Sequence, residues 1–251
     1  MRCLGQILCF GFVAAATIKV AQAQTVLSVE GAALWQTRNE IQIPGTTGTR
    51  FKLTDFGKGP FLKGRLYLGH TWSERHEIRA LYAPLTIKLG GRPKGALSFQ
   101  GQSFAADQDT EALYRFNSYR LTYAYHFAPG GAWSWALGFT AKIRDAEVSL
   151  TQGTIIATKK NIGFVPLLNV QVSRSLGMEW ALVADIDGLG APQGRAIDAA
   201  FFAERSLAHF ASLGVLSGFL GYRTVEGGAD NDEVYSFAWL HSAVLGLRGA
   251  F

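Results

Sequence analysis

The sequence predicts an all-β fold, a transmembrane antiparallel up-and-down β-barrel of ten strands, with eight or twelve strands as alternatives. Three observations predict it. Apolar and polar residues alternate with period two along many segments, as in strands whose two faces meet different surroundings. Turn-forming residues separate these segments. After residues 1–23 the chain is rich in aromatics and Gly, yet it has no apolar run near the ~20 residues that a membrane helix needs.

Residues 1–23 have the features of a secretory signal peptide. A basic start is followed by a mostly apolar run and by the small residues Ala21 and Ala23, which is the arrangement that signal peptidases cleave. We therefore predict a cleaved signal peptide over residues 1–23 and one barrel domain over residues 24–251. Both cysteines, Cys3 and Cys9, lie in the signal peptide, so the mature chain has no thiol for a disulfide or a metal site.

Ten segments show strand-like alternation. In chain order they cover residues 27–43, 62–72, 77–89, 113–127, 133–151, 160–174, 180–189, 195–205, 211–225 and 234–251. Four connections are tight turns and five are longer loops. Because an even number of strands returns the chain to its starting side, both termini and the tight turns are expected at one end of the barrel. In the third segment Pro84 cannot donate to a ladder, which predicts an irregularity there.

The last segment, 234–251, carries the most specific signal. Its odd positions include Tyr235, Phe237, Trp239 and the terminal Phe251, while its even positions are mostly small. A long strand with aromatics toward both ends and a terminal Phe resembles the closing strand of bacterial outer-membrane β-barrel proteins. The resemblance is to the small barrels of this superfamily as a whole, and it covers the mature chain through generic features.

This resemblance implies the outer membrane of a Gram-negative-type bacterium, with both termini in the periplasm. The implied partners are outer-membrane lipid, lipopolysaccharide and the barrel-assembly machinery, which would engage the strand ending at Phe251. Nucleic acid is not an expected partner, because the net charge of +5 is spread along the chain without a dense Lys/Arg run. A soluble β-sandwich is the alternative fold.

Charged residues on the inward phase of the strands are the candidate site residues, because lipid cannot solvate them. Seven are basic and four are acidic: Arg65, Arg79, Arg120, Lys142, Arg144, Asp185, Asp187, Asp198, Glu204, Arg223 and Arg248. Side chains largely fill a barrel lumen of this size, so one interpretation is a salt-bridged core in which Asp185 and Asp187 pair with Arg120 or Arg144. The other is a narrow, weakly anion-preferring conduit or a small polar-ligand site.

An acidic loop offers Asp230, Asp232 and Glu233 as oxygen ligands for a divalent cation, but it lacks the full spacing of a calcium loop. It is therefore either a cation-binding loop, with the metal unknown, or a solvated acidic loop. No cofactor is predicted, because Gly-rich pieces such as Gly90-Gly91 lack phosphate-loop spacing.

Two classes of function stay open. The favoured one is a non-enzymatic barrel with an envelope-structural role or narrow permeation of small solutes. The alternative is an outer-membrane enzyme, such as a lipid A-modifying hydrolase or acyltransferase or an omptin-like protease. These enzymes use a His with Asp or Ser partners, in omptins near the outer rim. Here His70, His76, His126 and His209 fall near the ends of strands on the periplasmic side, so no catalytic residue is assigned.

The remaining histidine, His241, is the exception to the face assignment. It falls on the lipid-facing phase in the middle of the last segment. We expect either a slip in strand register near His241 or a hydrogen-bond partner across the barrel wall, for example in an oligomer, because a lone imidazole is poorly solvated by lipid.

Overall fold

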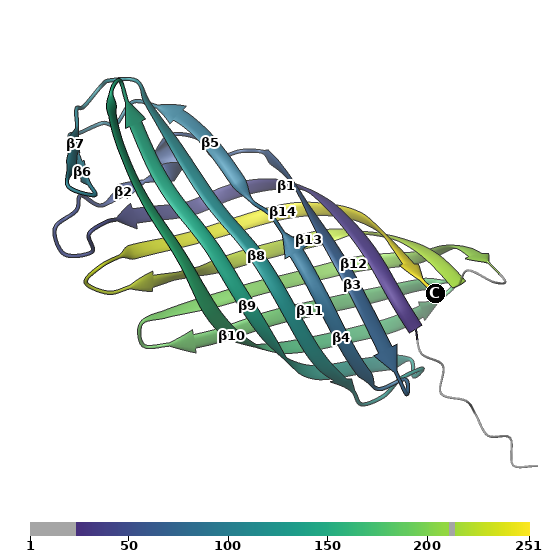
Figure 1. Cartoon of the computed structure of the whole chain (residues 1–251). Coiled ribbons are helices and arrows are strands. Elements are labelled where there is room, and N and C mark those ends of the chain that lie inside the picture. Colours follow the sequence, from purple (N-terminus) through teal and green to yellow (C-terminus); the bar gives the residue numbers. More distant parts are fainter. Residues whose placement is uncertain (1–23, 211–213) are drawn as a thin grey trace, which may run out of the picture.

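The computed structural model describes residues 24–210 and 214–251, so the signal peptide predicted over residues 1–23 lies outside the described residues. The described chain is a closed antiparallel β-barrel of ten strands (Figure 1). Neighbours in the chain pair with one another, and the last strand pairs with the first to close the sheet. The predicted fold class and strand number are confirmed.

The strands that form the wall are β1 (Gln24–Gln42), β3 (Phe61–Trp72), β4 (His76–Ala83) with β5 (Thr86–Gly91), β8 (Thr110–His126), β9 (Trp133–Gln152), β10 (Ile155–Gly177), β11 (Trp180–Ala191), β12 (Gly194–Phe210), β13 (Gly214–Asp230) and β14 (Tyr235–Ala250).

The elements β4 and β5 make one barrel strand that is interrupted at Pro84. Both pair with β8 in the same direction. At the break, the N–H of Leu85 donates to the side-chain oxygen of Asn117 at 3.0 Å, and the carbonyl of Leu85 accepts from the N–H of Phe116 at 2.8 Å. A side-chain amide thus replaces a ladder bond beside the proline, which has no N–H to donate. The irregularity predicted at Pro84 is confirmed.

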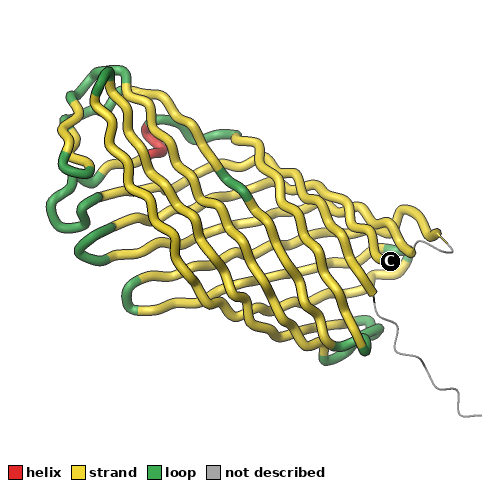
Figure 2. The backbone as a smooth tube through the Cα atoms, in the orientation of Figure 1, coloured by secondary structure: helices red, strands yellow, loops and turns green. Residues whose placement is uncertain are grey.

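The two ends of the barrel differ. At one end, which we call the terminal end, Thr25 and Phe251 exchange two backbone hydrogen bonds of 2.8 and 3.0 Å. The connections there include the short turns at residues 73–75 and 178–179. At the other end, which we call the loop end, β1 is joined to β3 and β5 to β8 by the two longest connections, residues 43–60 and 92–109 (Figure 2).

The long connections at the loop end carry structure of their own. The first holds β2 (Phe51–Lys52) and a short 3-10 helix, η1 (Leu53–Asp55), and the second holds the hairpin of β6 (Leu97–Phe99) and β7 (Gln102–Phe104). The hairpin segment is fastened at its base by Arg92, which donates to both oxygens of Asp109 at 2.7 and 3.2 Å. These hydrogen bonds lower the pKa of the Asp109 carboxyl from its usual value.

Three other connections at the loop end are shorter than predicted. Residues 153–154 and 192–193 are two-residue turns, and only residues 231–234 separate β13 from β14. The prediction of five longer loops is therefore wrong at these places. The Gly-rich segment 226–229 has turn chemistry, but in the barrel it pairs with β12 on one side and β14 on the other. Ladder bonds on both sides outweigh the weak strand preference of glycine.

Large apolar side chains cover the outside of the wall. On β9 the outward residues Trp133, Trp135, Leu137, Phe139 and Ile143 are 43–55% exposed, whereas Thr140 and Lys142 between them are buried. The outward phase predicted from the sequence is confirmed on this strand. No helix within residues 24–210 and 214–251 is long and apolar enough to span a membrane.

Arginines cover two of the outward aromatics at the loop end of β14. Arg50 lies 3.6 Å above the ring of Tyr235, and Arg38 and Arg195 lie 5.2 and 5.3 Å from the ring centre of Phe237. Tyr235 and Phe237 are consequently only 8% and 9% exposed. This end of β14 therefore presents cations rather than bare aromatic rings.

The lumen has two zones. Toward the loop end it is apolar, because Leu34, Ile41, Ile87 and Leu150 from the wall pack with Leu53 of η1 and with the β6–β7 hairpin. Farther toward the terminal end, the inward positions carry charged side chains that are buried. The boundary between these zones forms the candidate functional site.

Candidate functional site

Asp198 of β12 lies at the centre of the charged zone and accepts hydrogen bonds from three arginines. Arg65 of β3 donates at 2.8 Å, Arg120 of β8 at 2.6 Å and Arg223 of β13 at 2.7 Å. All four side chains are no more than 5% exposed. The carboxylate therefore joins strands from opposite sides of the barrel wall.

Glu30 of β1 completes this group, although it was not among the predicted lumen residues. Arg223 donates to its two oxygens at 3.1 and 2.8 Å, and Arg65 lies 3.7 Å away. A sequence signal for Glu30 exists, since the apolar Leu27 and Val29 occupy the opposite phase of the strand. The alternation of β1 thus places Glu30 inward.

Asp187 and Asp185 of β11 each hold a separate arginine. Arg120 donates to Asp187 at 2.8 Å, and Arg79 of β4 lies 3.0 Å from Asp185. The side-chain amide of Asn169 bridges them, donating to Asp185 at 3.0 Å and to Asp187 at 2.9 Å. The two aspartates are therefore arranged as partners of two separate arginines. Of the partners predicted, Arg120 is present and Arg144 is not.

We call this group the charged layer. It comprises four arginines and four carboxylates: Arg65, Arg79, Arg120, Arg223, Glu30, Asp185, Asp187 and Asp198. The two small voids that border it measure about 10 and 20 Å³, which is room for about one water each. The charged layer is balanced in formal charge and fills the cross-section of the lumen.

The other predicted lumen charges lie outside the charged layer. Arg248 forms an ion pair with Glu204 nearer the terminal end. Lys142 and Arg144 of β9 lie on the loop-end side, where neither has a carboxylate within 4 Å among the described residues. Sequence reasoning placed all these side chains inward, but only the structure separates the balanced layer from the two unpaired cations.

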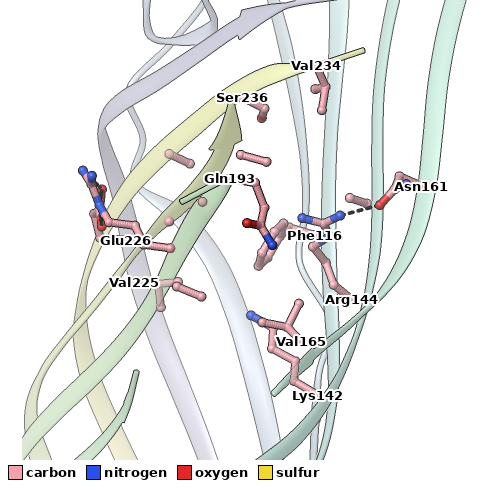
Figure 3. A pocket seen from close by; sticks show the side chains of 18 of the residues that line it. Phe116, Lys142, Arg144, Asn161, Val165, Gln193, Val225, Glu226, Val234 and Ser236 are labelled. Carbon is pink, nitrogen blue, oxygen red and sulfur yellow. Dashed lines mark hydrogen bonds and ion pairs between the residues drawn. The ribbon is translucent and has the colours of Figure 1, made fainter. Parts of the chain in front are cut away.

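A cavity of about 440 Å³ lies between the charged layer and the loop end. Lys142 and Asp198 line it at the charged layer, and Gln193, Asn231 and Glu233 line it at the loop end. Much of the wall between them is apolar: Phe116, Val148, Val165, Pro166, Leu167, Val225 and Leu240. In Figure 3, the polar ends of Lys142, Arg144 and Gln193 point toward the same space.

Of the cations that line the cavity, Lys142 and Arg144 have few partners. Lys142 is 3% exposed, and its ammonium lies 4.9 Å from the ring centre of Phe116. Arg144 donates to the side-chain oxygen of Asn161, while its Nε is buried without an acceptor among the described residues. A buried cation without a counter-charge is costly, so this is the part of the lumen best suited to hold an anionic group.

The acidic loop does not gather its three carboxylates. The carboxylate of Glu233 lies 3.8 Å from the ammonium of Lys159 of β10. The backbone N–H groups of Glu233 and Val234 donate to the side-chain oxygen of Asn231. Within residues 24–210 and 214–251, no group of three or more His, Cys, Asp or Glu side chains is placed to hold a metal ion. Asp230, Asp232 and Glu233 therefore do not form a common site.

His241 stays on the outward phase of β14, between the exposed Trp239 and Leu245. The register between β1 and β14 shifts between Gln36 and Arg38, leaving Thr37 as a bulge. The Oγ1 of Thr37 lies 2.9 Å from Nε2 of His241, and the hydroxyl of Tyr222 contacts Nδ1. The slip is thus in the neighbouring strand, and the partners come from the same chain.

The other four histidines lie in strand segments near the terminal end. His126 contacts Glu77 at 3.1 Å, and His209 contacts Glu179 at 3.1 Å. Glu77 faces the lumen beside Arg79 and was not among the predicted residues. None of the five histidines lines the cavity in the described part of the chain.

Comparison with known proteins identifies the fold. The structure is similar to the outer-membrane protease OmpT of Escherichia coli, with a TM-score of 0.51 and 9% sequence identity over 91% of this chain and 97% of that chain. At the level of the fold, the chain resembles outer-membrane β-barrels. No protein-family model matches the sequence, and a search of curated proteins finds no match.

Two further solved structures match less well. The toluene transporter TodX of P. putida has a TM-score of 0.26 and 10% identity over 91% of this chain and 90% of its own. A FadL homologue of Pseudomonas aeruginosa has a TM-score of 0.27 and 11% identity over 91% and 89%. At these sequence identities the comparisons show the fold alone and leave the activity of this chain open.

Proposed function

We propose that this chain is a non-enzymatic outer-membrane barrel that binds a small ligand in a cavity open toward the cell exterior. Its loop end faces outward and both termini face the periplasm. One observation carries the proposal: the cavity of about 440 Å³ ends at the charged layer, and the voids that border this layer hold about one water each. The volume lies in the range of about 300–1,000 Å³ that is usual for ligand pockets.

The charged layer favours a binding cavity over an open pore. A conduit through the lumen would have to separate Asp198 from three arginines, each at 2.6–2.8 Å. Removing one partner of a buried ion pair typically costs about 3–5 kcal/mol. In its resting state the barrel is therefore closed to ions and solutes.

The chemistry of the cavity supports binding rather than catalysis. Acyl transfer and hydrolysis by a Ser nucleophile need a base within hydrogen-bond reach. Among the described residues no hydrogen bond joins a Ser to a His, and the cavity lining contains no His. The two aspartates of β11, Asp185 and Asp187, form ion pairs with Arg79 and Arg120.

Thiol accessibility tests this proposal. Ser236 lines the cavity, and Ser217 is buried in the lumen opposite Arg248, on the other side of the charged layer. Each is replaced singly by Cys in a background without Cys3 and Cys9, and a membrane-impermeant thiol reagent is added outside intact cells. We expect Ser236→Cys to react and Ser217→Cys to be protected. Equal reaction of both, or of neither, would overturn the proposal.

A further inference from the structure

The barrel wall has a gap on the side of the cavity. The ladder between β10 and β11 runs from Gly177 to Leu168, where Leu168 pairs with Gly188, and stops there. β10 nevertheless continues to Ile155, paired with β9 from Arg174 onward, and β11 continues to Ala191, paired with β12. In Figure 1 the upper half of β10 runs away from the β11–β12 hairpin.

A proline lies at the point where the ladder stops. Continuing the register by two residues from the Leu168–Gly188 pair would bring Pro166 opposite Gly190. Proline has no N–H to donate and is found in sheets mainly on edge strands. Pro166 therefore accounts for the change of β10 from an inner strand to an edge strand at this position.

The cavity reaches this gap. Its lining includes Phe164, Val165 and Pro166 on the β10 side, and Leu189 and Ala191 on the β11 side. Leu189 shares the inward phase of Asp187, yet it is 39% exposed, whereas Asp187 is 7% exposed. We call the opening between residues 164–167 and 189–191 the window.

The window lies where the apolar outer surface ends. Along β10 the outward side chains Leu168, Phe164 and Ile162 are 57–74% exposed, and the next outward residue is Lys160. On the other side of the window, Ile197 of β12 is also outward and 41% exposed. In a membrane, apolar rims at this height adjoin the acyl chains of the outer leaflet.

The lining of the cavity is amphipathic. The cations of Lys142 and Arg144 lie on the β9 side without carboxylate partners, and apolar side chains such as Phe116, Val225 and Leu240 form other parts of the wall. A ligand with one anionic head group and an apolar chain would neutralise the buried cations and cover this apolar surface.

We propose that the cavity takes a single-chain amphiphile with an anionic head group, a carboxylate or a phosphate, which enters sideways from the outer leaflet through the window. The head group binds Lys142 and Arg144, and the chain lies along the apolar wall toward Pro166. This inference rests on the proposed function, because it names the ligand class of the same cavity.

Binding of cis-parinaric acid, a fluorescent fatty acid, to the mature barrel in lipid nanodiscs tests the ligand class. We expect saturable binding above that of empty nanodiscs, with competition by palmitate or by hexadecyl phosphate and none by hexadecanol. The more effective competitor distinguishes the carboxylate from the phosphate. Absence of saturable binding, or equal competition by the alcohol, would overturn the inference. The proposed function is tested separately, by the thiol accessibility of Ser236→Cys and Ser217→Cys.

A variant of Lys142 tests the head-group site. Lys142→Met keeps the length of the side chain and removes the charge, and loss of a charge-assisted hydrogen bond lowers affinity by about 10- to 100-fold. Lys88→Met is the matched control, because Lys88 is exposed on β5 and does not line the cavity. Circular dichroism and heat-modifiable gel mobility verify folding. Unchanged affinity in folded Lys142→Met would overturn the head-group assignment.

A bulky label at the window tests the route. Leu189→Cys, made without Cys3 and Cys9 and labelled with fluorescein maleimide, places the dye at the rim. Leu182→Cys carries the same dye farther along β11, on an outward position that is 48% exposed. We expect the association rate of palmitate, measured by its competition with cis-parinaric acid, to fall only for labelled Leu189→Cys. Equal rates for the two labelled proteins would contradict lateral entry.

Discussion

Arg223 joins two carboxylates of the lumen, with one guanidinium nitrogen 2.7 Å from Asp198 and two others within 3.1 Å of Glu30. These two acids lie on β12 and β1, which are separated in the wall by β13 and β14. The arginine thus ties together four consecutive strands around the point where the barrel closes. Its neighbours Arg65 and Arg120 extend the same network to the opposite wall.

Replacing Asp198 should destabilise the barrel strongly. In Asp198→Ala, three buried guanidinium groups lose a shared carboxylate, and removing one partner of a buried pair costs about 3–5 kcal/mol. Urea unfolding of the refolded protein in lipid vesicles measures the change. Asp109→Ala, which removes an exposed carboxylate that is paired with one exposed arginine, is the control and should leave the unfolding curve in place. Similar shifts for both variants would contradict a structural role of the charged layer.

Substituting Gly246 should overpack the lumen. Gly246 of β14 faces Phe219 of β13 in the ladder, and a Cβ atom there would collide with the Phe219 ring, which is 3% exposed and packs on Phe202. We expect Gly246→Ala to lose about 1–3 kcal/mol of unfolding free energy, which is usual for overpacked cores. Gly190→Ala is the matched control, because a Cβ there meets nothing within 4 Å. Equal unfolding midpoints for the two variants would exclude a steric role of Gly246.

Replacing His241 should weaken the contact between β1 and β14. His241→Leu keeps an apolar outward surface but leaves the hydroxyls of Thr37 and Tyr222 without the imidazole partner. Hydrogen bonds between transmembrane helices contribute about 0.6 kcal/mol on average, and we expect a loss of similar size here. A double-mutant cycle with Tyr222→Phe measures the coupling directly. Strict additivity would show that the contact contributes nothing to stability.

Much of the fold follows from the sequence because barrel strands must alternate. The outward phase of β9 and the break at Pro84 depend on local residue chemistry alone, and both are found. The lengths of the loop-end connections do not follow in this way. Segment 226–229 has the composition of a loop, and only pairing with strands on both sides makes it part of β13.

The candidate site was less accessible to sequence reasoning. The inward phase identifies Arg120 and Asp198 individually, but their pairing across the lumen depends on strand tilt and barrel closure. Glu30 could have been found from the apolar Leu27 and Val29 on the opposite phase. The window could not, because it depends on where the ladder between β10 and β11 stops. Pro166 is the only local signal for it that we identify in the described chain.

Chelation of divalent cations should leave the barrel unchanged. Glu233 contacts Lys159 rather than Asp230 and Asp232, and these three carboxylates form no common site. We expect equal melting temperatures with EDTA and with excess calcium in detergent that lacks lipopolysaccharide. A calcium-dependent rise in Tm that disappears in Asp232→Asn would instead establish the loop as a cation site.

The wild-type barrel should not conduct, and removal of one ion pair from the charged layer should open it. Arg120 and Asp187 pair at 2.8 Å inside the layer, and replacing both by Ser removes two large side chains without changing the net charge. Planar-bilayer recordings should show no steps for the wild type and small steps for the Arg120→Ser/Asp187→Ser protein. The matched control is Arg92→Ser/Asp109→Ser, which removes an equally close but exposed pair from the loop end. If the wild type already conducts, the lumen is a pore and the cavity is its vestibule. If neither double variant conducts, apolar packing rather than the charged layer closes the barrel.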